Sequence, residues 1–276
     1  MNINKWLKKT VKILSHLDNP RYEAKLLLSY VVNRTYSSII LLEDIKLNLS
    51  EYHKLKSFIY RRSMGEPIAY ITGKKEFWSL SFRVSYDTLI PRPDTEILIE
   101  KVLSKIDMDK KSILDLGTGC GAIALSLASI CSNWKIFGVD KSHEAIKIAK
   151  INALELNIKN VTFFYSDWFS NIEKKFHVII SNPPYISMKE IKSLEKDIFF
   201  EPFFALFSKK NGLSDIAYII KKSKKYLFYG GWLFIEHSWQ QRLNVQNFLK
   251  SENFSNIESY KDYAGNYRVT IGRKKK

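Results

Sequence analysis

Apolar residues in roughly the first seventy positions recur at helical spacing. The segment Lys5–Leu17 places its apolar side chains close to one helical face. The pair Asn19-Pro20 predicts a helix N-terminus, with Asn19 as the cap and Pro20 in the first turn of a helix that runs to about Val32. Further helices are predicted over Ser37–Leu42 and Ser50–Met64. Residues 1–73 are therefore expected to form a bundle of about four or five helices.

The hydrophobic period changes at Lys74. From Lys74 to Thr88 the apolar residues fall near alternation, and neither glycine nor proline interrupts them. This pattern is typical of a pair of strands. Residues 74–90 therefore predict a β-hairpin that links the helical bundle to the remainder of the chain.

From Pro91 to the C-terminus, short apolar runs typical of strands alternate with helical patterns. A helix is predicted from Asp94 to about Ile106. The predicted strands and helices that follow are Ile113–Leu116, Ile123–Ser129, Ile136–Val139, Ser142–Asn157, Val161–Tyr165, His177–Ile180, Leu213–Tyr226, Trp232–Glu236, Ile257–Tyr260 and Tyr267–Gly272. The alternation predicts an α/β domain over residues 91–276, with a mostly parallel sheet, helices on both faces and an antiparallel pair of strands at the end.

Composition narrows the class of protein. With 276 residues, of which 45% are hydrophobic, the chain is long enough to bury a full core, which excludes a disordered or collagen-like chain. Its apolar runs fall far short of the about 20 residues that span a bilayer, and no signal peptide is recognisable. Cys120 and Cys131 are too few for a disulfide framework and are not spaced as metal ligands. We expect a cytoplasmic protein without membrane contact.

The net charge of +16 indicates affinity for phosphate-rich or acidic partners. Lysine supplies 35 of the 44 cations. A coding bias toward A/T-rich codons explains that excess as well as a phosphate-binding surface does. Charge alone therefore leaves both explanations open.

A glycine-rich turn follows the first strand of the α/β domain, in the segment Asp115–Gly121. Glycine permits positive φ, and its missing Cβ lets a ligand approach the backbone beside a helix N-terminus. The spacing G-x-G-x-G, at Gly117, Gly119 and Gly121, differs from the G-x-G-x-x-G of dinucleotide sites. It favours a smaller ligand with an amino-acid end, although a tight turn without a ligand is the simpler alternative.

Acidic residues follow the next two strands. Asp140 lies 23 residues after Gly117, where its carboxylate can accept hydrogen bonds from both hydroxyls of a ribose. The side chain of Asp167 and a neighbouring backbone N–H suit the exocyclic amine and ring nitrogen of adenine, and Trp168 would lie against the base. A helix cap at Asp140 and a turn with a core tryptophan are the structural alternatives.

The segment Asn182-Pro183-Pro184-Tyr185 follows a buried strand. Two adjacent prolines stiffen the loop, so the Asn182 side-chain oxygen and the Pro183 carbonyl become fixed acceptors. Two fixed acceptors suit a planar NH2 group, because they align the nitrogen and favour the pyramidal form that develops as it attacks a methyl group in line. Tyr185 would stack on the planar group.

Together these motifs resemble those of class I S-adenosylmethionine-dependent methyltransferases that act on amide or exocyclic nitrogens. Within that class the chain resembles the peptide chain release factor glutamine methyltransferase family, known as HemK or PrmC. The resemblance also covers segments outside the core motifs, namely Gly65–Gly73, Glu76–Trp78, Leu89–Glu96 and Gly265–Thr270. It therefore extends over nearly the whole chain.

The resemblance implies a Rossmann-like methyltransferase domain over residues 91–276, preceded by a helical domain (1–73) that helps to engage the substrate and a hairpin linker (74–90). It implies S-adenosylmethionine as cofactor, S-adenosylhomocysteine as product and no metal. The implied substrate is the glutamine of the Gly-Gly-Gln motif in peptide chain release factors, methylated directly at N5, which modulates translation termination. No general base stands in the motif.

The resemblance also implies roles for individual residues. The methionine and ribose parts of the cofactor would be bound by Gly117, Thr118, Gly119, Cys120, Gly121 and Asp140, and its adenine region by Asp167 and Trp168. Asn182 would lie between cofactor and substrate, and Pro183, Pro184 and Tyr185 would complete the glutamine pocket. The expected catalytic set is Asn182, Pro183 and Tyr185. Arg92, Thr95 and Glu96 match a family motif, but a helix start explains them equally well.

Two other functions fit parts of the sequence. An adenine-N6 methyltransferase acting on rRNA or DNA would present the same planar NH2 group to Asn182–Tyr185, and the +16 charge favours it. The matches outside the core and the lack of a recognisable base-reading domain argue against it. A non-catalytic RNA-binding module would leave the motifs unexplained. We expect release factors as partners, no requirement for nucleic acid, and a monomer.

Overall fold

The computed structural model describes residues 3–41, 47–194 and 196–275. It divides into two compact units. The first contains residues 1–74 and 196–200, and the second contains residues 75–195 and 201–276. None of the described helices is long and apolar enough to cross a membrane.

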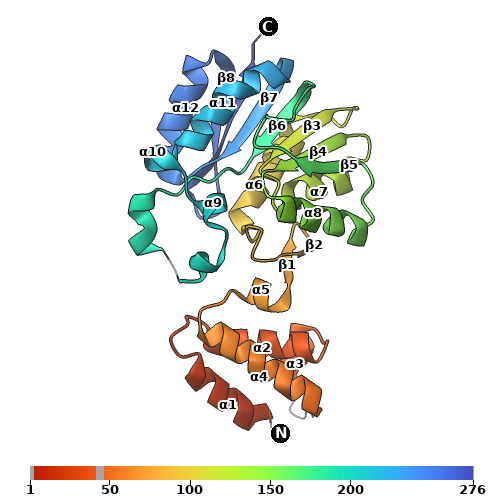
Figure 1. Cartoon of the computed structure of the whole chain (residues 1–276), viewed down its shortest axis with the longest axis vertical. Helices are drawn as coiled ribbons and strands as arrows, with labels where there is room; N and C mark the ends of the chain where they lie inside the picture. Colours follow the sequence, from red (N-terminus) through yellow and green to blue (C-terminus); the bar gives the residue numbers. More distant parts are fainter. Residues whose placement is uncertain (1–2, 42–46, 195, 276) are drawn as a thin grey trace. The chain divides into compact units, whose positions relative to one another are not determined.

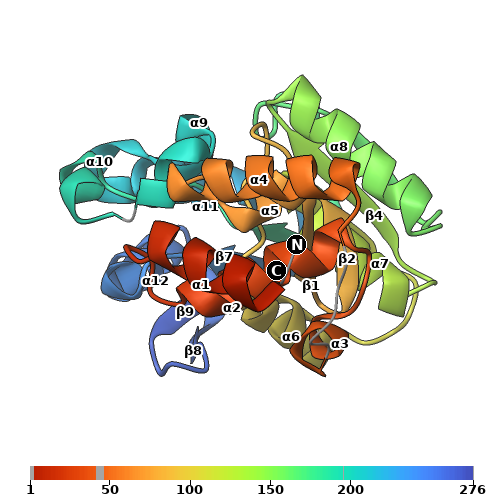
Figure 2. The same cartoon turned by 90° about the horizontal axis from the view of Figure 1, so that it is seen from below.

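The described part of the first unit is helical. Its helices are α1 (Ile3–Ile13), α2 (Pro20–Val31), α3 (Tyr36–Leu41), α4 (Leu49–Ser63), α5 (Ile68–Thr72) and the 3-10 helix η3 (Lys196–Phe200). Helix α2 contacts α1, α3, α4 and α5 (Figure 2). Leu14, Leu27 and Leu55 are fully buried in the core that these helices enclose. The helical bundle predicted from the hydrophobic period is present.

The helix ends in this unit differ in part from the prediction. Asn19 occupies the N-cap position of α2 and Pro20 begins the helix, as predicted, but the Asn19 side chain makes no capping hydrogen bond. A capping box starts α4 instead: Oδ1 of Asn48 accepts from the Glu51 N–H at 2.9 Å, and the Glu51 carboxylate accepts from the Asn48 N–H at 2.9 Å. Helix α1 ends at Ile13 and not at Leu17, because residues 14–18 turn toward α2. Residue 42, the predicted end of the third helix, lies outside the described residues.

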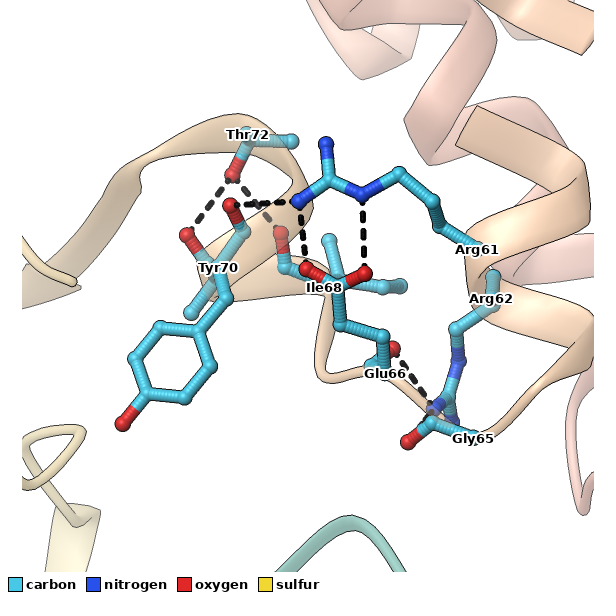
Figure 3. Close-up of polar contacts among 8 residues, drawn as sticks. Arg61, Arg62, Gly65, Glu66, Ile68, Tyr70 and Thr72 are labelled. Carbon is cyan, nitrogen blue, oxygen red and sulfur yellow. Dashed lines mark hydrogen bonds and ion pairs between the residues drawn. The ribbon is translucent and has the colours of Figure 1, made fainter. Parts of the chain in front are cut away.

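The segment Gly65–Gly73 connects α4 with α5 and contains α5 itself (Figure 3). Arg61 forms an ion pair with Glu66, and its guanidinium also donates to the Tyr70 carbonyl at 3.4 Å. The Thr72 hydroxyl donates to the Ile68 carbonyl at 2.9 Å. These contacts fasten the turn to both helices.

Arg62 ties the same turn to α2. Its guanidinium donates to the carbonyls of Gly65 and Glu66 at 3.3 and 3.1 Å (Figure 3). It also forms an ion pair with Glu23 of α2. Only 7% of Arg62 is exposed. A buried guanidinium is tolerated when its donors are satisfied, which the two carbonyls and the carboxylate achieve here.

The predicted hairpin is confirmed. Strands β1 (Lys74–Phe77) and β2 (Leu80–Arg83) form a two-stranded sheet. Trp78 and Ser79 connect them with positive φ values of 51° and 58°, as a tight turn between twisted strands requires. The rings of Phe77 and Phe82 pack edge to face with centroids 6.2 Å apart.

A seven-stranded sheet forms the centre of the second unit (Figure 1). Its strands are β3 (Ser112–Leu116), β4 (Lys135–Asp140), β5 (Val161–Tyr165), β6 (Phe176–Ser181), β7 (Leu227–Glu236), β8 (Phe254–Lys261) and β9 (Tyr267–Lys274). They lie in the order β5-β4-β3-β6-β7-β9-β8. The first five pair in parallel, whereas β9 pairs antiparallel with both β7 and β8. The predicted mostly parallel α/β fold with an antiparallel strand is confirmed.

Helices cover both faces of this sheet. After the 3-10 helix η1 (Pro93–Thr95), α6 (Glu96–Lys105), α7 (Ala122–Ile130) and α8 (His143–Glu155) lie on one face, and α11 (Ser214–Tyr226) and α12 (Arg242–Ser251) on the other (Figure 1). Leu114, Ile179 and Leu233 of the sheet pack with Ile219 of α11 and Leu249 of α12.

Several elements were not predicted from the hydrophobic period. They are α12 and the short helices η2 (Met188–Ser193), η3, α9 (Phe203–Leu206), α10 (Lys209–Gly212) and η4 (Trp239–Gln241). Most of these helices have six residues or fewer, which is too short for a helical period to be recognised.

Candidate active site

The sequence motifs meet at one edge of the sheet, where the parallel strands β3, β4, β5 and β6 end. Strand β3 lies between β4 and β6, so β4 and β5 are added on one side of it and the later strands on the other. Ligands of open α/β sheets bind where the strand order reverses in this way. A pocket opens there. It is lined by Asp87, Thr88, Leu89, Gly117, Gly119, Asp140, Lys141, Ser166, Asp167, Trp168, Asn182, Pro184, Phe204 and Ala205.

Gly117 and Gly119 keep the floor of this pocket open. Both have positive φ, 72° and 55°, which favours glycine. A Cβ added to Gly119 would meet no atom within 4 Å and would therefore project into open space. A Cβ on Gly117 would come within 3.5 Å of the Trp168 ring. The turn thus forms a cradle that side chains would fill.

Asp140 is held beside the cradle by backbone donors. Its Oδ2 accepts from the Gly119 N–H and its Oδ1 from the Ser142 N–H, each at 2.9 Å. Burial raises the pKa of Asp140, and the two N–H groups oppose that rise. Each carboxylate oxygen can accept a further hydrogen bond, so the fixed carboxylate suits a pair of ligand hydroxyls. The residues present fit the ribose end of a nucleoside cofactor.

Asp167 and Trp168 form the wall beyond β5. Trp168 has a positive φ of 49°, and its carbonyl accepts from the Ser166 hydroxyl at 2.8 Å. Its ring stands over Gly117, as the 3.5 Å approach shows. An aromatic face beside a carboxylate provides both a flat contact and an acceptor, the two features that an adenine needs.

The pocket lining does not include Thr118, Cys120 and Gly121. The Thr118 hydroxyl donates to Asp115 at 2.6 Å, and burial raises the pKa of Asp115 to about 7. Cys120 is 2% exposed, and its carbonyl accepts from Asn152 at 2.8 Å. Gly121 leaves no room for a Cβ, which would lie 2.9 Å from the Phe163 ring. In this structure the three residues support the shape of the turn.

Asn182 lies at the end of β6 and faces the pocket. Its Nδ2 donates to Oγ1 of Thr95 at 3.2 Å. Because the NH2 group of the side chain is engaged in this way, Oδ1 remains the acceptor that the pocket can use. Pro183 and Pro184 are buried, and of these two only Pro184 lines the pocket.

Tyr185 is anchored through its hydroxyl, which donates to Oε1 of Glu236 at 3.3 Å. Glu236 is the last residue of β7 and is 1% exposed. Burial raises the pKa of Glu236 to about 7 and also raises the pKa of Tyr185. The sequence did not indicate a role for Glu236 in the site, because a single acidic residue after an apolar run is typical of the end of a strand.

The motif residues without a predicted role have clear contacts. Arg92 forms an ion pair with Glu201, and Thr95 accepts the hydrogen bond from Asn182. Oε1 of Glu96 accepts from the Trp78 N–H at 2.8 Å and so ties the hairpin turn to α6. Each residue of this motif thus fixes a different segment around the pocket.

Comparison with known proteins agrees with this geometry. Residues 92–206 match the methyltransferase small domain, and residues 5–73 match the PrmC N-terminal domain. The fold is similar to that of a methyltransferase from Pyrococcus furiosus, with a TM-score of 0.55 and 18% identity over 80% of this chain and 98% of that chain. Fold and pocket together define a class I methyltransferase.

The curated relatives narrow the class. The chain is 66% identical over 275 residues to the release factor glutamine methyltransferase of Buchnera aphidicola subsp. Schizaphis graminum, covering 100% of both chains. It is 41% identical over 274 residues to the release factor glutamine methyltransferase of Escherichia coli, covering 99% of both. The chain belongs to the release factor glutamine methyltransferase family, which confirms the resemblance found in its motifs.

Proposed function

We propose that the chain transfers a methyl group from S-adenosylmethionine to N5 of the glutamine in the Gly-Gly-Gln motif of peptide chain release factors, and that Asn182 holds the reacting amide. Membership of the family supports the reaction. The hydrogen bond from Asn182 to Thr95 carries the assignment of the site, because it leaves Oδ1 as the acceptor in the pocket. An acceptor at that place matches a substrate NH2 group.

Different residues of the pocket bind different parts of the cofactor. Gly117 and Gly119 leave space for the methionine end, Asp140 accepts from the ribose hydroxyls, and Asp167 and Trp168 bind the adenine. The cofactor supplies a methyl group on a sulfonium, which is already electrophilic. The protein therefore has to bind the cofactor, orient the substrate amide and exclude water, and no metal is required.

The loop Asn182–Tyr185, called the acceptor loop below, has to overcome the weak nucleophilicity of the substrate amide. The lone pair of an amide nitrogen is delocalised into the carbonyl. Oδ1 of Asn182 and the Pro183 carbonyl accept the two N–H groups and favour a pyramidal nitrogen, so that the nitrogen–carbon bond forms as the carbon–sulfur bond breaks. The extra proton leaves after transfer, when the methylated amide is strongly acidic, so no general base is needed.

The helical domain, residues 1–73, is proposed to engage the release factor, with residues 74–90 as the linker. Between α1 and α4 it has a groove lined by Lys5, Trp6, Lys9, Tyr52, Lys56 and Tyr60, among others. Cations and aromatic side chains together suit an acidic protein surface. We further propose that the chain acts as a monomer in the cytoplasm and does not require nucleic acid.

Methyl transfer from labelled S-adenosylmethionine tests the proposal. The acceptors are purified release factor, its Gln-to-Ala variant in the Gly-Gly-Gln motif, and rRNA and DNA as controls. Label on the unaltered factor alone supports the proposal, and the Asn182→Ala enzyme should then lose transfer while it still binds the cofactor. Label on nucleic acid would reassign the chain to the adenine methyltransferases.

A further inference from the structure

The Gln241 side chain holds the backbone at the C-terminal end of the acceptor loop. Its Nε2 donates to the Tyr185 carbonyl at 2.9 Å and to the Asn211 carbonyl at 3.2 Å. Its Oε1 accepts from the Ser238 N–H at 3.1 Å. Only 6% of Gln241 is exposed. A buried carboxamide with its oxygen and its nitrogen both engaged therefore joins η4 to the acceptor loop.

These three partners leave the Gln241 carboxamide a single orientation. The two carbonyls can only accept and the Ser238 N–H can only donate. A half-turn that exchanged the oxygen and the nitrogen of the carboxamide would therefore place like groups against one another at every contact. Buried polar groups without a partner are costly, which opposes such a rotation. Gln241 is thus a fixed donor to both carbonyls.

A left-handed segment of α10 packs against the same carbonyl of the acceptor loop. Lys210, Asn211 and Gly212 have φ values of 54°, 57° and 80°. The first two are not glycines, and such residues keep a left-handed backbone where their surroundings fix it. A Cβ added to Gly212 would overlap the Tyr185 carbonyl and the Gln241 amide. The acceptor loop, α10 and η4 therefore meet closely at the Tyr185 carbonyl.

The acceptor loop is in this way anchored on both sides of its two prolines. At its start, strand β6 pairs with β3 up to Ser181. At its end, Tyr185 is held by its carbonyl through Gln241 and by its hydroxyl through Glu236. The proline rings fix φ of the two residues between these anchors. A displacement of the Tyr185 backbone is therefore passed on to the Pro183 carbonyl.

We propose that Gln241 is a positioning residue that fixes the Tyr185 carbonyl and thereby places the Pro183 carbonyl and the Tyr185 ring against the substrate amide. This inference rests on the proposed function and adds to it a residue outside the acceptor loop. Neither Gln241 nor Tyr185 lines the cofactor pocket. Loss of their hydrogen bond should therefore slow methyl transfer, which depends on the alignment of the reacting groups, and leave cofactor binding in place.

Gln241→Glu and Gln240→Glu form a matched pair, because both exchange an amide for a carboxylate on η4. The new carboxylate at residue 241 would face two carbonyls without a donor, whereas residue 240 is exposed. In full-length enzyme in excess over release factor, we expect Gln241→Glu to lower the single-turnover rate of methyl transfer by at least about tenfold. Its affinity for S-adenosylmethionine should change by less than about twofold, and Gln240→Glu should keep the transfer rate within about threefold.

Gln241→Met tests the same hydrogen bond without a new charge, because methionine keeps the length of the side chain and has no donor. This variant should also transfer at least about tenfold more slowly than the unaltered enzyme. Calorimetry with S-adenosylmethionine counts the folded cofactor sites of each variant. A slow transfer step is thereby separated from a loss of fold.

The outcomes that overturn the positioning role differ from those that contradict the proposed function. An unaltered transfer rate in Gln241→Met would overturn the positioning role, and so would a rate that falls only in proportion to the cofactor sites lost. Gln240→Glu as slow as Gln241→Glu would assign the effect to charge and overturn it as well. No transfer to release factor by the unaltered enzyme would contradict the proposed function and, with it, this inference.

Discussion

Arg92 forms an ion pair with Glu201, which lies 109 residues further along the chain. The Glu201 side chain is 1% exposed, and its second oxygen accepts from the Ile90 N–H at 3.0 Å. Glu201 lies two residues before α9, which supplies Phe204 to the pocket wall. The contacts of Glu201 therefore join residues 90–92 to the segment that carries α9 and part of the pocket wall.

Replacing Arg92 should weaken both the fold and the pocket. In Arg92→Ala the Glu201 carboxylate stays buried without its cation, and we expect a loss of about 1–3 kcal/mol, less than for a fully buried pair because Arg92 is 37% exposed. The KM for S-adenosylmethionine should rise as α9 loosens. Denaturant unfolding and cofactor calorimetry measure the two effects. Glu201→Gln, which removes the stranded charge, should be milder, and an Arg92→Ala enzyme with unchanged stability would contradict the structural role.

Alanine substitutions at Gly119, in the pocket, and at Gly265, outside it, should have different effects although both glycines have positive φ. Gly119→Ala should cost about 1 kcal/mol through its positive φ and weaken cofactor binding by at least about tenfold, because the new methyl group enters the pocket. Gly265→Ala is the matched control: its φ is 88°, and no atom lies within 4 Å of the added Cβ. It lies in the β8–β9 loop and should lose stability only. Equal cofactor affinities in the two variants would argue against ligand binding at Gly119.

Much of the fold could be predicted because its signals are local. The period of apolar residues located the strands of the sheet, and glycine spacing located the turn after β3. The contacts that complete the site are not local: Asn182 and Thr95 are 87 residues apart, and no pattern in a single sequence pairs them. Asn19 shows the limit of a local signal: it stands at the N-cap of α2 as predicted, but its side chain makes no capping hydrogen bond.

The turn drawn in Figure 3 predicts a stability effect in the helical unit. Arg62→Ala should destabilise that unit by about 3 kcal/mol, because it leaves Glu23 and two carbonyls without their buried donor. Arg21→Ala removes an exposed cation from the same helical unit and should change stability by less than about 0.5 kcal/mol. Thermal unfolding followed by circular dichroism measures both. Similar effects for the two variants would show that the buried network contributes little.

Glu236 predicts how stability changes with pH. Burial raises its pKa from 4.5 to about 7, so the folded chain binds its proton more tightly than the unfolded chain does. The stability gained from this proton is fully present below the unfolded pKa and is lost as the pH rises through about 7. Glutamine does not titrate, so the Glu236→Gln variant has no such pH-dependent loss of stability at this position. Relative to the unaltered enzyme, the variant should therefore gain at most about 3 kcal/mol between about pH 5 and about pH 8.

Denaturant unfolding of both proteins across that pH range measures the difference, and the contribution of Asp115 cancels because both proteins retain it. Glu258→Gln is the control of opposite sign, since hydrogen bonds from Tyr260 and Lys105 lower the pKa of Glu258. Its contribution is present above the unfolded pKa and decreases only in acid, so that variant should show no relative gain toward alkaline pH. Parallel stability curves for Glu236→Gln and the unaltered enzyme would mean that Glu236 is ionised throughout, with its charge stabilised by the Tyr185 hydroxyl and by Arg268.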